Sequence, residues 1–550
     1  MKKIIFILLL FPGAAHVNAA AGIATAHPMA TRAGEEILQQ GGNAFDAAVA
    51  ISAALAVVEP YSSGIGGGGF WLLHRSSDGF ETMLDGREKA PLKAHRDMYL
   101  DKSGNVVPGL SMDGPLAAGI PGVPAALEAL SKKYGKLSLK QSLQPAIKYA
   151  ENGFKVDEHY RRMAGFRLKA LQTSPAAAQI FLHNNEVPEE GHLIKQPDLA
   201  RTLSLIAEKG AAGFYRGEVA KKLISGVKAA GGIWTEEDLK KYTTLERKPI
   251  TGQFHEMKIT SAAPPSSGGI ALVEMLNQLS HYTLASFEKP QAIHLGIEVM
   301  RRAYRDRAQF LGDTDFVKVP VKRLISQDYA SGLSATIHPH KAMPSALLPG
   351  VAHDNNSRDT THFSVIDKEG NRVAATLSVN YPFGACFVAP GTGVLLNDEM
   401  DDFSAKPGVA NAYGLVGAIA NEITPGKRML SSMSPTFLET EDRLAVIGTP
   451  GGSRIITMVL LGSIRFYSGM EAEQIVNGPR FHHQYLPDTV YFEPKAFSEE
   501  TIKSLERMGH KLNQSNNRWG NMQVVIMDKK TKKITAASDK RGVGKAVVIE

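Results

Sequence analysis

The sequence of 550 residues contains a single cysteine, Cys386. One thiol excludes an intramolecular disulfide and any Cys-rich metal site. Long hydrophobic runs are also missing after the N-terminus, because the longest candidate, residues 47–58, is shorter than the roughly 18 apolar residues that a membrane span needs. The sequence therefore predicts a soluble mature protein without a membrane anchor.

Runs of like charge are missing as well. The formal net charge is +7, and it falls to +5 if Lys2 and Lys3 are removed with a leader that contains no acid. Nucleic-acid-binding proteins usually carry a clustered basic stripe, so we expect no nucleic-acid partner. With 43% hydrophobic and 21% charged residues, the composition is globular, and the length allows a large core or two domains.

The first twenty residues have the three parts of a secretory signal peptide. Lys2 and Lys3 are followed by an apolar run at residues 4–11 and then by small residues. We expect residues 1–20 to be the signal peptide, with cleavage between residues 19 and 21. Export without disulfides fits a bacterial periplasm, and secretion is the alternative.

Helix and strand patterns alternate along the chain without an internal repeat. A helix is predicted within residues 41–60, where Asn43 or Asp46 could cap it and Pro60 stops it. Four consecutive glycines at 66–69 then lead into an apolar strand. No Gly-Lys-Ser/Thr follows and the glycines precede the strand, so close backbone packing is favoured over a phosphate cradle.

Residues 123–246 are predicted to be mostly helical, with their charges on solvated faces. Two further helices are predicted at 270–279 and 293–311. The second places three apolar residues on one face and three arginines mostly away from it. The apolar residues are Leu295, Val299 and Ala303, and the arginines are Arg301, Arg302 and Arg305.

Residues 339–358 are rich in Pro, Ser and Asn and look like an exposed connector, which makes them the clearest boundary in the sequence. The remainder is rich in strands. THFSVID and RVAATLSV predict a hairpin around the turn KEGN, and PTFLETEDRLAVIGTPGG predicts another. Helices from about Ile455 and Glu471 and a final strand pair follow. Strands with helices on both sides indicate a layered α/β or α+β protein.

Pattern alone does not locate the chemistry, since a Thr-Thr pair at the start of a strand is usually a β-branched strand filler. At Thr360 and Thr361, however, the sequence resembles a known family. DTTHFSVIDKEGN, LLNDEMDDFSAKPG, RMLSSMSPT, TPGGSRI and GPRFHHQYLPD are similar to small-subunit motifs of the gamma-glutamyltranspeptidases, also called glutathione hydrolases. GGNAFDAAVA, VVEPYSSGIGGGGF and DGREKAP extend the resemblance to the N-terminal half.

The resemblance implies an α+β fold, the four-layer αββα sandwich of the N-terminal-nucleophile hydrolases. It also implies a precursor that cuts itself between Asp359 and Thr360 into a large subunit (21–359) and a small subunit (360–550). Cleavage would free the α-amine of Thr360, whose reference pKa is about 7.7 to 8. The nucleophilic hydroxyl and a candidate base would then belong to one residue.

The activity implied is that of a gamma-glutamyltransferase and glutathione hydrolase. A γ-glutamyl group from glutathione or a glutamine-like donor would pass through an ester on Thr360 to water or to an amino acid or peptide acceptor. The resemblance implies no cofactor.

The resemblance also implies roles for individual residues. The α-carboxylate of the donor would be held by Arg87, Ser431 and Ser432, because an arginine fork suits a carboxylate. Its α-ammonium would be held by Asn380, Glu399 and Asp402. The backbone of Gly451 and Gly452 would form the oxyanion hole, although the same glycines also fit a simple turn.

Three positions carry further expectations from the resemblance. Ser378 stands where the family commonly has a second threonine that hydrogen-bonds the nucleophile. Glu399 is Gln in some members. Residues 404–429 resemble a lid loop, with Tyr413 as its gating residue; the alternative is an ordinary surface loop.

Histidines could suggest a metal site, but no carboxylate spacing completes one. We expect His362, His482 and His483 to be packed and hydrogen-bonded, and Cys386 to be a structural thiol. Metal is therefore absent from the predicted site.

Two alternatives to this function remain. Cephalosporin acylases and polyglutamate depolymerases are related enzymes that use the same nucleophile on other acyl groups. The complete clamp favours a free γ-glutamyl end, and the lid disfavours a long polymer. A non-catalytic binding or scaffold protein with the same fold is the other alternative, and intact Thr360, Gly451 and Gly452 weigh against it.

Overall fold

The computed structural model describes residues 20–283, 286–348 and 360–550, apart from five positions between 407 and 416. The five are Pro407, Ala410, Ala412, Tyr413 and Val416. The signal peptide predicted for residues 1–20 lies outside the described residues except for Ala20, and so does the end of the predicted connector.

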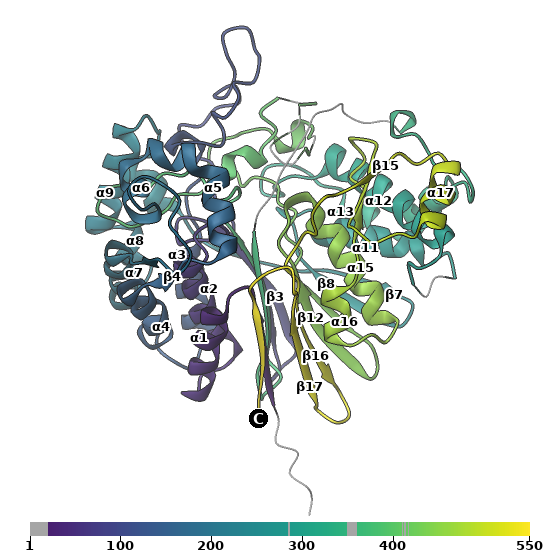
Figure 1. The fold of residues 1–550 in the computed structure, drawn as a ribbon, viewed down its shortest axis with the longest axis horizontal. Coiled ribbons are helices and arrows are strands. Elements are labelled where there is room, and N and C mark those ends of the chain that lie inside the picture. Colours follow the sequence, from purple (N-terminus) through teal and green to yellow (C-terminus); the bar gives the residue numbers. More distant parts are fainter. Residues whose placement is uncertain are drawn as a thin grey trace, which may run out of the picture.

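Two sheets stacked face to face form the centre of the molecule (Figure 1). The first has the strand order β18-β1-β9-β10-β2-β3-β6, and the second has the order β17-β16-β12-β11-β8-β7. The strands of the first sheet are β1 (Ala21–Thr25), β2 (Gly68–Arg75), β3 (Phe80–Gly86), β6 (Leu245–Arg247), β9 (Thr361–Ile366), β10 (Arg372–Ser378) and β18 (Lys545–Ile549). Those of the second are β7 (Ile250–Phe254), β8 (Met257–Ser261), β11 (Thr436–Glu439), β12 (Arg443–Gly448), β16 (Gln523–Asp528) and β17 (Ile534–Ser538).

Helices cover the outer face of each sheet, on the left and right of Figure 1. Beside the first sheet lie α1 (Pro28–Gln39), α2 (Ala44–Val58), α3 (Val123–Tyr134), α4 (Leu139–Asn152), α5 (Glu158–Thr173), α6 (Pro175–Phe181), α7 (Pro197–Lys209), α8 (Ala212–Tyr215), α9 (Gly217–Ala229) and α10 (Glu236–Lys241). Beside the second lie α11 (Gly268–Leu279), α12 (Pro290–Phe310), α13 (Val321–Leu324), α14 (Gln327–Ser334), α15 (Ile455–Tyr467), α16 (Ala472–Asn477) and α17 (Glu499–Arg507). The predicted four-layer αββα sandwich is therefore confirmed.

Short elements complete the chain outside these layers. The minor strands are β4 (Phe154–Lys155), β5 (Leu193–Ile194), β13 (Phe481–His482), β14 (Val490–Phe492) and β15 (Leu512–Gln514). The 3-10 turns are η1 (Pro115–Ala117), η2 (Ser345–Leu347), η3 (Glu399–Asp402), η4 (Ile419–Asn421) and η5 (Gly452–Arg454). Among the described residues, no helix is both long and apolar enough to cross a membrane.

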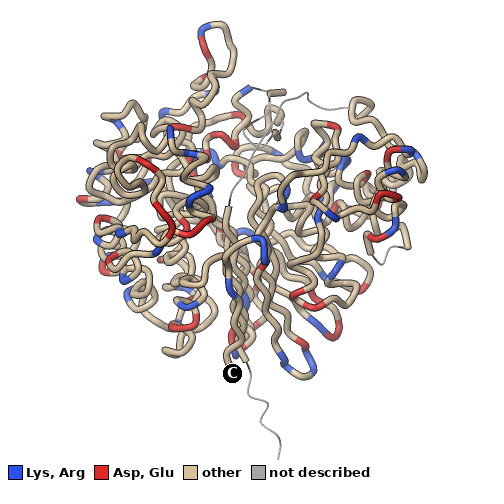
Figure 2. The backbone as a smooth tube through the Cα atoms, viewed as in Figure 1, with Lys and Arg blue, Asp and Glu red and all other residues tan. Residues whose placement is uncertain are grey.

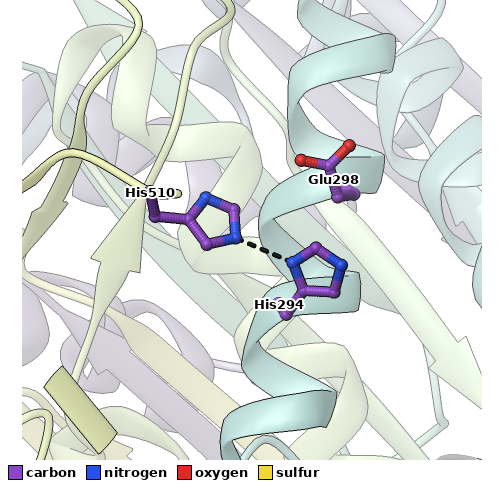
Figure 3. A group of neighbouring side chains, drawn as sticks. All are labelled: His294, Glu298 and His510. Atoms are coloured by element: carbon purple, nitrogen blue, oxygen red, sulfur yellow. Dashed lines mark hydrogen bonds between the residues drawn. The ribbon is translucent and has the colours of Figure 1, made fainter. Parts of the chain in front are cut away.

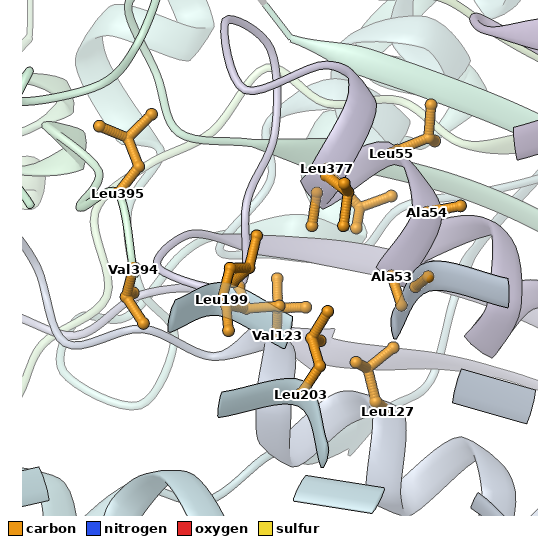
Figure 4. Packing of buried hydrophobic residues seen from close by; sticks show 14 of the residues in the cluster. Ala53, Ala54, Leu55, Val123, Leu127, Leu199, Leu203, Leu377, Val394 and Leu395 are labelled. Carbon is orange, nitrogen blue, oxygen red and sulfur yellow. The ribbon is translucent and has the colours of Figure 1, made fainter. Parts of the chain in front are cut away.

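Helix α2 begins where its sequence predicts. The Asn43 side chain accepts from the backbone N–H groups of Phe45 and Asp46, and the Asp46 carboxylate accepts from the Asn43 N–H at 3.0 Å. Both predicted caps therefore act together as a capping box. Figure 4 shows how Ala53, Ala54 and Leu55 of this helix lie in one apolar cluster with side chains of α3, α7 and β10.

Strand β10 connects two cores because its side chains alternate between the faces of the sheet. Val373, Ala375 and Leu377 face the cluster that contains α2, whereas Ala374 belongs to the cluster between the two sheets. The predicted hairpin of β9 and β10 is confirmed, with Leu377 paired to Thr361.

The glycines that precede β2 allow close backbone packing, as predicted. A Cβ atom on Gly67 would lie 2.2 Å from the Ser378 carbonyl oxygen, and one on Gly66 would lie 2.0 Å from that of Leu395. A side chain at Gly67 would push the end of β10 away, and one at Gly66 would displace the backbone at Leu395. Gly67 thus fixes the backbone around Ser378.

Two of the three arginines of α12 are buried, which the sequence did not predict. Arg301 and Arg302 are 2% and 0% exposed. Both pair with Glu298 one turn earlier, at 3.3 Å and 2.7 Å. The helix is enclosed on its polar side too, and a buried carboxylate offsets the charge, which a periodicity of apolar residues does not reveal.

Charged residues elsewhere lie mainly on the outer helices and loops, where both signs intermingle (Figure 2). The strands at the centre carry few of them. This distribution agrees with the sequence, in which Lys, Arg, Asp and Glu are interspersed.

Candidate active site

Thr360 immediately precedes β9 and is 5% exposed. Leu377 pairs with Thr361 across the hairpin, so Ser378, one residue further along β10, stands beside Thr360. Thr361 has a different environment, because its hydroxyl donates to the Glu59 carboxylate at 2.7 Å and is buried. The two neighbouring threonines therefore differ: Thr361 ties the strand to the end of α2, and Thr360 borders cavities.

Ser378 and Asn380 form a tight turn at the end of β10. The Ser378 hydroxyl accepts from the Asn380 backbone N–H at 2.8 Å. Asn380 adopts a left-handed conformation with φ of 76°, and its amide donates to the Asp398 carbonyl at 3.0 Å. This turn places both side chains beside η3, which contains Glu399 and Asp402.

Gly451 and Gly452 lie between β12 and α15, with φ values of 137° and 56°. Only glycine adopts the first of these readily, and a Cβ on Gly451 would lie 2.6 Å from the Met458 side chain. Their backbone lies near Thr360, because Gly452 shares one narrow pocket with it and Gly451 lines a neighbouring cavity that also reaches it. The arrangement is suitable for an oxyanion hole.

Arg87 lines the narrow pocket and is 1% exposed. Its guanidinium donates to Glu399 and to Asp402, each at 2.5 Å. Further bonds to the Met429 and Leu430 carbonyl oxygens, at 3.3 Å and 3.5 Å, hold the fork in place. The residues assigned to the two ends of a bound γ-glutamyl group are thus in direct contact with each other.

The charges in this pocket are strongly coupled. Burial raises the pKa of Glu399 to about 7, against the lowering effect of Arg87. Burial, followed by repulsion from Glu399, raises the pKa of Glu88 well above its usual range. Burial also opposes the charge of Arg87, but Glu399 and Asp402 outweigh it and raise its pKa. One buried arginine therefore lies among three acids, Glu88, Glu399 and Asp402.

Ser431 and Ser432 line the same pocket. The Ser431 backbone N–H donates to the Pro265 carbonyl at 2.8 Å, which joins the loop to the start of α11. The Ser432 hydroxyl accepts from Arg307 of α12 at 3.2 Å. Sequence reasoning missed Arg307, because nothing in RRAYRDR distinguishes it from the arginines around it.

Two cavities meet at Thr360. The narrow one, about 20 Å³, is lined by Arg87, Ser378, Asn380, Glu399, Asp402, Ser431, Ser432 and Gly452. The wide one, about 1230 Å³, lies on the other side and includes Gly451, Arg454 and Trp519. The structure thus brings together the predicted nucleophile, oxyanion glycines and donor-binding residues, which are dispersed from residue 87 to residue 452.

Asp359 and Tyr413 lie outside the described residues. Described parts of the predicted lid nevertheless lie next to the site: the Asn411 amide donates to Asp402 at 3.1 Å, and Gln484 donates to the Gly414 carbonyl at 3.0 Å. Asn411 therefore lies beside Asp402, and Leu415 lines the same narrow pocket.

The predicted structural residues are buried and hydrogen-bonded. His362 bonds the Thr376 hydroxyl at 2.8 Å and His482 bonds that of Thr457 at 2.8 Å, and burial lowers the pKa of each to about 3. His483 bonds Asp488 at 3.1 Å. Burial raises the pKa of the Cys386 thiol to about 12, although Arg167 contacts the sulfur at 3.3 Å. These groups lack the reactivity of a thiolate or a free imidazole.

A different group, His294, Glu298 and His510, has the composition of a metal site (Figure 3). The two imidazoles, however, bond each other at 2.8 Å, and Glu298 is already paired with both Arg301 and Arg302. Two buried guanidinium groups next to the carboxylate oppose a further cation. We interpret this group as structural.

Comparison with known proteins agrees with this geometry. The profile of the gamma-glutamyltranspeptidase family matches residues 30–549. The chain is 46% identical over 495 residues to a "Glutathione hydrolase proenzyme" of Pseudomonas sp. (strain A14), covering 89% of this chain and 86% of that protein.

Solved structures give the same result. The gamma-glutamyltranspeptidase of Helicobacter pylori is 44% identical, with a TM-score of 0.58 over 59% of this chain and 94% of that one. A cephalosporin acylase from Bacillus halodurans is 27% identical, with a TM-score of 0.85 over 99% of both chains. This chain belongs to the gamma-glutamyltranspeptidase family.

Proposed function

We propose that this protein is a gamma-glutamyltransferase and glutathione hydrolase whose nucleophile is Thr360 after self-cleavage. One observation carries the proposal: Thr360 lies at the junction of a charged donor pocket and a wide cavity, with the glycines of the oxyanion hole beside it. An acyl-transfer enzyme needs these parts together.

Self-cleavage uses the same hydroxyl. Thr360 Oγ1 attacks the carbonyl carbon of Asp359, the peptide C–N bond breaks, and the Thr360 nitrogen leaves as an amine. Water then hydrolyses the resulting ester, which releases the Asp359 carboxylate and restores the hydroxyl. The products are a large subunit (21–359) and a small subunit (360–550).

The first sheet explains why the two subunits would stay together. Strand β9 of the small subunit pairs with β1 of the large subunit, and β10 pairs with β2. The C-terminal strand β18 pairs with β1 on its other edge. Separation would therefore break the sheet hydrogen bonds along several strands.

Donor binding would exchange one set of ion pairs for another. The α-carboxylate of the γ-glutamyl group takes the Arg87 fork with Ser431 and Ser432, and its α-ammonium takes Glu399 and Asp402 with Asn380. A zwitterion leaves the total charge of the buried pocket unchanged, so the exchange avoids a net desolvation cost for an unpaired charge.

Catalysis then proceeds at Thr360. Its free α-amine accepts the hydroxyl proton, the alkoxide attacks the γ-carbonyl, and the oxyanion receives backbone N–H groups of Gly451 and Gly452. Collapse expels the amine, which takes its proton from the Thr360 ammonium, and leaves a γ-glutamyl ester, with Ser378 orienting the nucleophile. Water, an amino acid or a peptide enters from the wide cavity and takes the acyl group.

The wide cavity suits peptide leaving groups and acceptors because its lining includes polar side chains such as Arg454 and Asn521 beside apolar surface. Tyr413 would close the donor pocket from the lid. We place the mature protein in the periplasm, with secretion as the alternative, on the basis of the predicted signal peptide.

A denaturing gel tests self-processing. Purified wild-type protein should give two fragments, and Thr360→Ala should give one uncut chain without activity. An uncut, inactive wild-type chain would instead favour the non-catalytic scaffold.

The related cephalosporin acylase is the specific reason to test a second acyl group. Release of the aniline from a γ-glutamyl anilide should exceed release from the glutaryl analogue, which lacks the α-ammonium. Addition of a dipeptide should increase release if transfer competes with hydrolysis. Equal turnover of both anilides would favour the acylase function.

A further inference from the structure

Arg307 lies beneath the donor pocket, on α12, and is 5% exposed. Its Nε donates to the Ser267 hydroxyl at 3.0 Å and its Nη2 donates to the Ser432 hydroxyl at 3.2 Å. Within the part of the chain that the structure describes, no carboxylate forms an ion pair with it. The other buried arginines of this helix, Arg301 and Arg302, both have such a partner.

The contact with Ser432 determines where its hydroxyl hydrogen can point. A serine hydroxyl has one hydrogen to donate and lone pairs to accept with. The Ser432 oxygen accepts from Arg307, and the Ser431 oxygen accepts from the Met433 backbone N–H at 3.1 Å. Both oxygens thus receive an N–H group on one side, which leaves each hydrogen to be donated on the other.

Arg307 also holds the backbone of this loop. The Ser267 hydroxyl, which accepts from Arg307, donates to the Ser431 carbonyl at 2.7 Å. One guanidinium therefore fixes Ser432 directly and Ser431 through Ser267. Because Arg87 is already shared between Glu399 and Asp402, Arg307 supplies the positive charge that these acids do not neutralise.

We infer that Arg307 is a positioning residue for the α-carboxylate of the donor: it turns the Ser432 hydroxyl toward that carboxylate and adds a positive charge behind it. The inference rests on the proposed function and adds a residue to its donor site. Arg307 does not touch the donor in this arrangement, so its effect on binding passes through Ser432 and through the electrostatic field.

The test compares ligands with and without the carboxylate. In Arg307→Met, the KM for a γ-glutamyl anilide and the inhibition constant of L-glutamate should each rise about tenfold, the usual effect of losing a hydrogen bond from a charged group. The inhibition constant of 4-aminobutanoate, which keeps the ammonium but lacks the α-carboxylate, should stay within about twofold, and kcat should change little. Equal weakening of both inhibitors, or an unchanged KM, would overturn the inference.

A double-mutant cycle identifies the path of the effect. Arg307→Met should raise KM much less in the Ser432→Ala variant than in the wild type, because Ser432→Ala has already removed the Arg307–Ser432 hydrogen bond. Full additivity would contradict action through Ser432. If Arg307→Met does not fold, Arg307→Lys takes its place. Lysine keeps the positive charge but cannot bond both Ser267 and Ser432, so the KM for the donor should still rise. A KM equal to that of the wild type would refute the role of Arg307.

Arg302→Lys is the matched control, since it alters a buried arginine on the same helix outside the pocket. Its ratio of inhibition constants should equal that of the wild type. If the wild-type protein releases no aniline from the γ-glutamyl anilide, the proposed function itself fails. If the wild type is active and Arg307→Met binds glutamate normally, only the role of Arg307 fails.

Discussion

The molecule contains two clusters in which buried arginines pair with acids, one in the donor pocket and one in α12, and their roles differ. In the pocket, Arg87 pairs with Glu399 and Asp402; in α12, Arg301 and Arg302 pair with Glu298. The α12 cluster is centred on one helix turn and is completed by Asp488, which pairs with Arg301, and by the Thr336 carbonyl, which accepts from Arg302 at 3.1 Å. The pocket cluster joins segments more than 300 residues apart and borders the nucleophile.

The difference teaches what separates a binding cluster from a structural one. In α12, two cations meet two carboxylates, Glu298 and Asp488, so the charges are balanced and a ligand has nothing to exchange. In the pocket, one cation meets three acids, Glu88, Glu399 and Asp402, and burial raises the pKa of Glu399 to about 7. At neutral pH the Glu399 carboxyl is therefore close to its pKa, and a bound ammonium would favour its ionised form.

Removing the pocket arginine should have the largest effect. In Arg87→Met, kcat/KM for a γ-glutamyl anilide should fall about 1000-fold, because the carboxylate contact is lost and two buried acids are left uncompensated, at about 3–5 kcal/mol. Steady-state kinetics on the processed enzyme provide the measurement, and the two fragments on a gel are the control for folding. A loss below tenfold would show that Arg87 does not bind the donor.

Removing an arginine from α12 should affect stability instead. Arg302→Met should lower the free energy of unfolding by about 3–5 kcal/mol, the usual cost of breaking a buried pair. Urea unfolding would measure it. The kcat/KM of the folded fraction should stay within about twofold, and a large selective change in donor KM would erase the distinction between the clusters.

The smallest effect concerns pH. Glu399 has a pKa raised to about 7 by burial, so its ionised form, which binds the ammonium, is lost as pH falls below 7. The Thr360 amine, with a pKa of about 7.7 to 8, loses its basic form over a nearby range. In the wild type, log kcat/KM should therefore fall with a slope near two at low pH.

Glu399→Gln removes one of these titrations. Its slope should be close to one, and its kcat/KM at pH 6 should lie within about tenfold of the value at pH 7. The same slope in both enzymes would show that Glu399 does not titrate with donor binding.

The free energy of unfolding should change with pH in the direction opposite to kcat/KM. Because folding raises the pKa of Glu399, the stability contributed by its neutral form is present below pH 4.5 and is lost as pH rises through 7.

Much of the fold follows from local sequence. The cap at Asn43, the glycines before β2 and the turn KEGN each act on neighbouring residues, so they predict α2, β2 and the β9–β10 hairpin correctly. The motifs around Thr360 and Gly451 likewise identify the family from the sequence alone. Their chemistry requires particular residue types, and those remain readable in order along the chain.

Tertiary structure decided what depends on distant neighbours. The burial of Arg301 and Arg302 depends on how other elements enclose α12, and the contact of Arg87 with Glu399 joins positions 312 residues apart. Arg307 has the same local pattern as the arginines near it, and only packing places it under Ser432. The sequence determines which side chains can carry a charge, but folding determines which partner each charge meets and how polar its surroundings are.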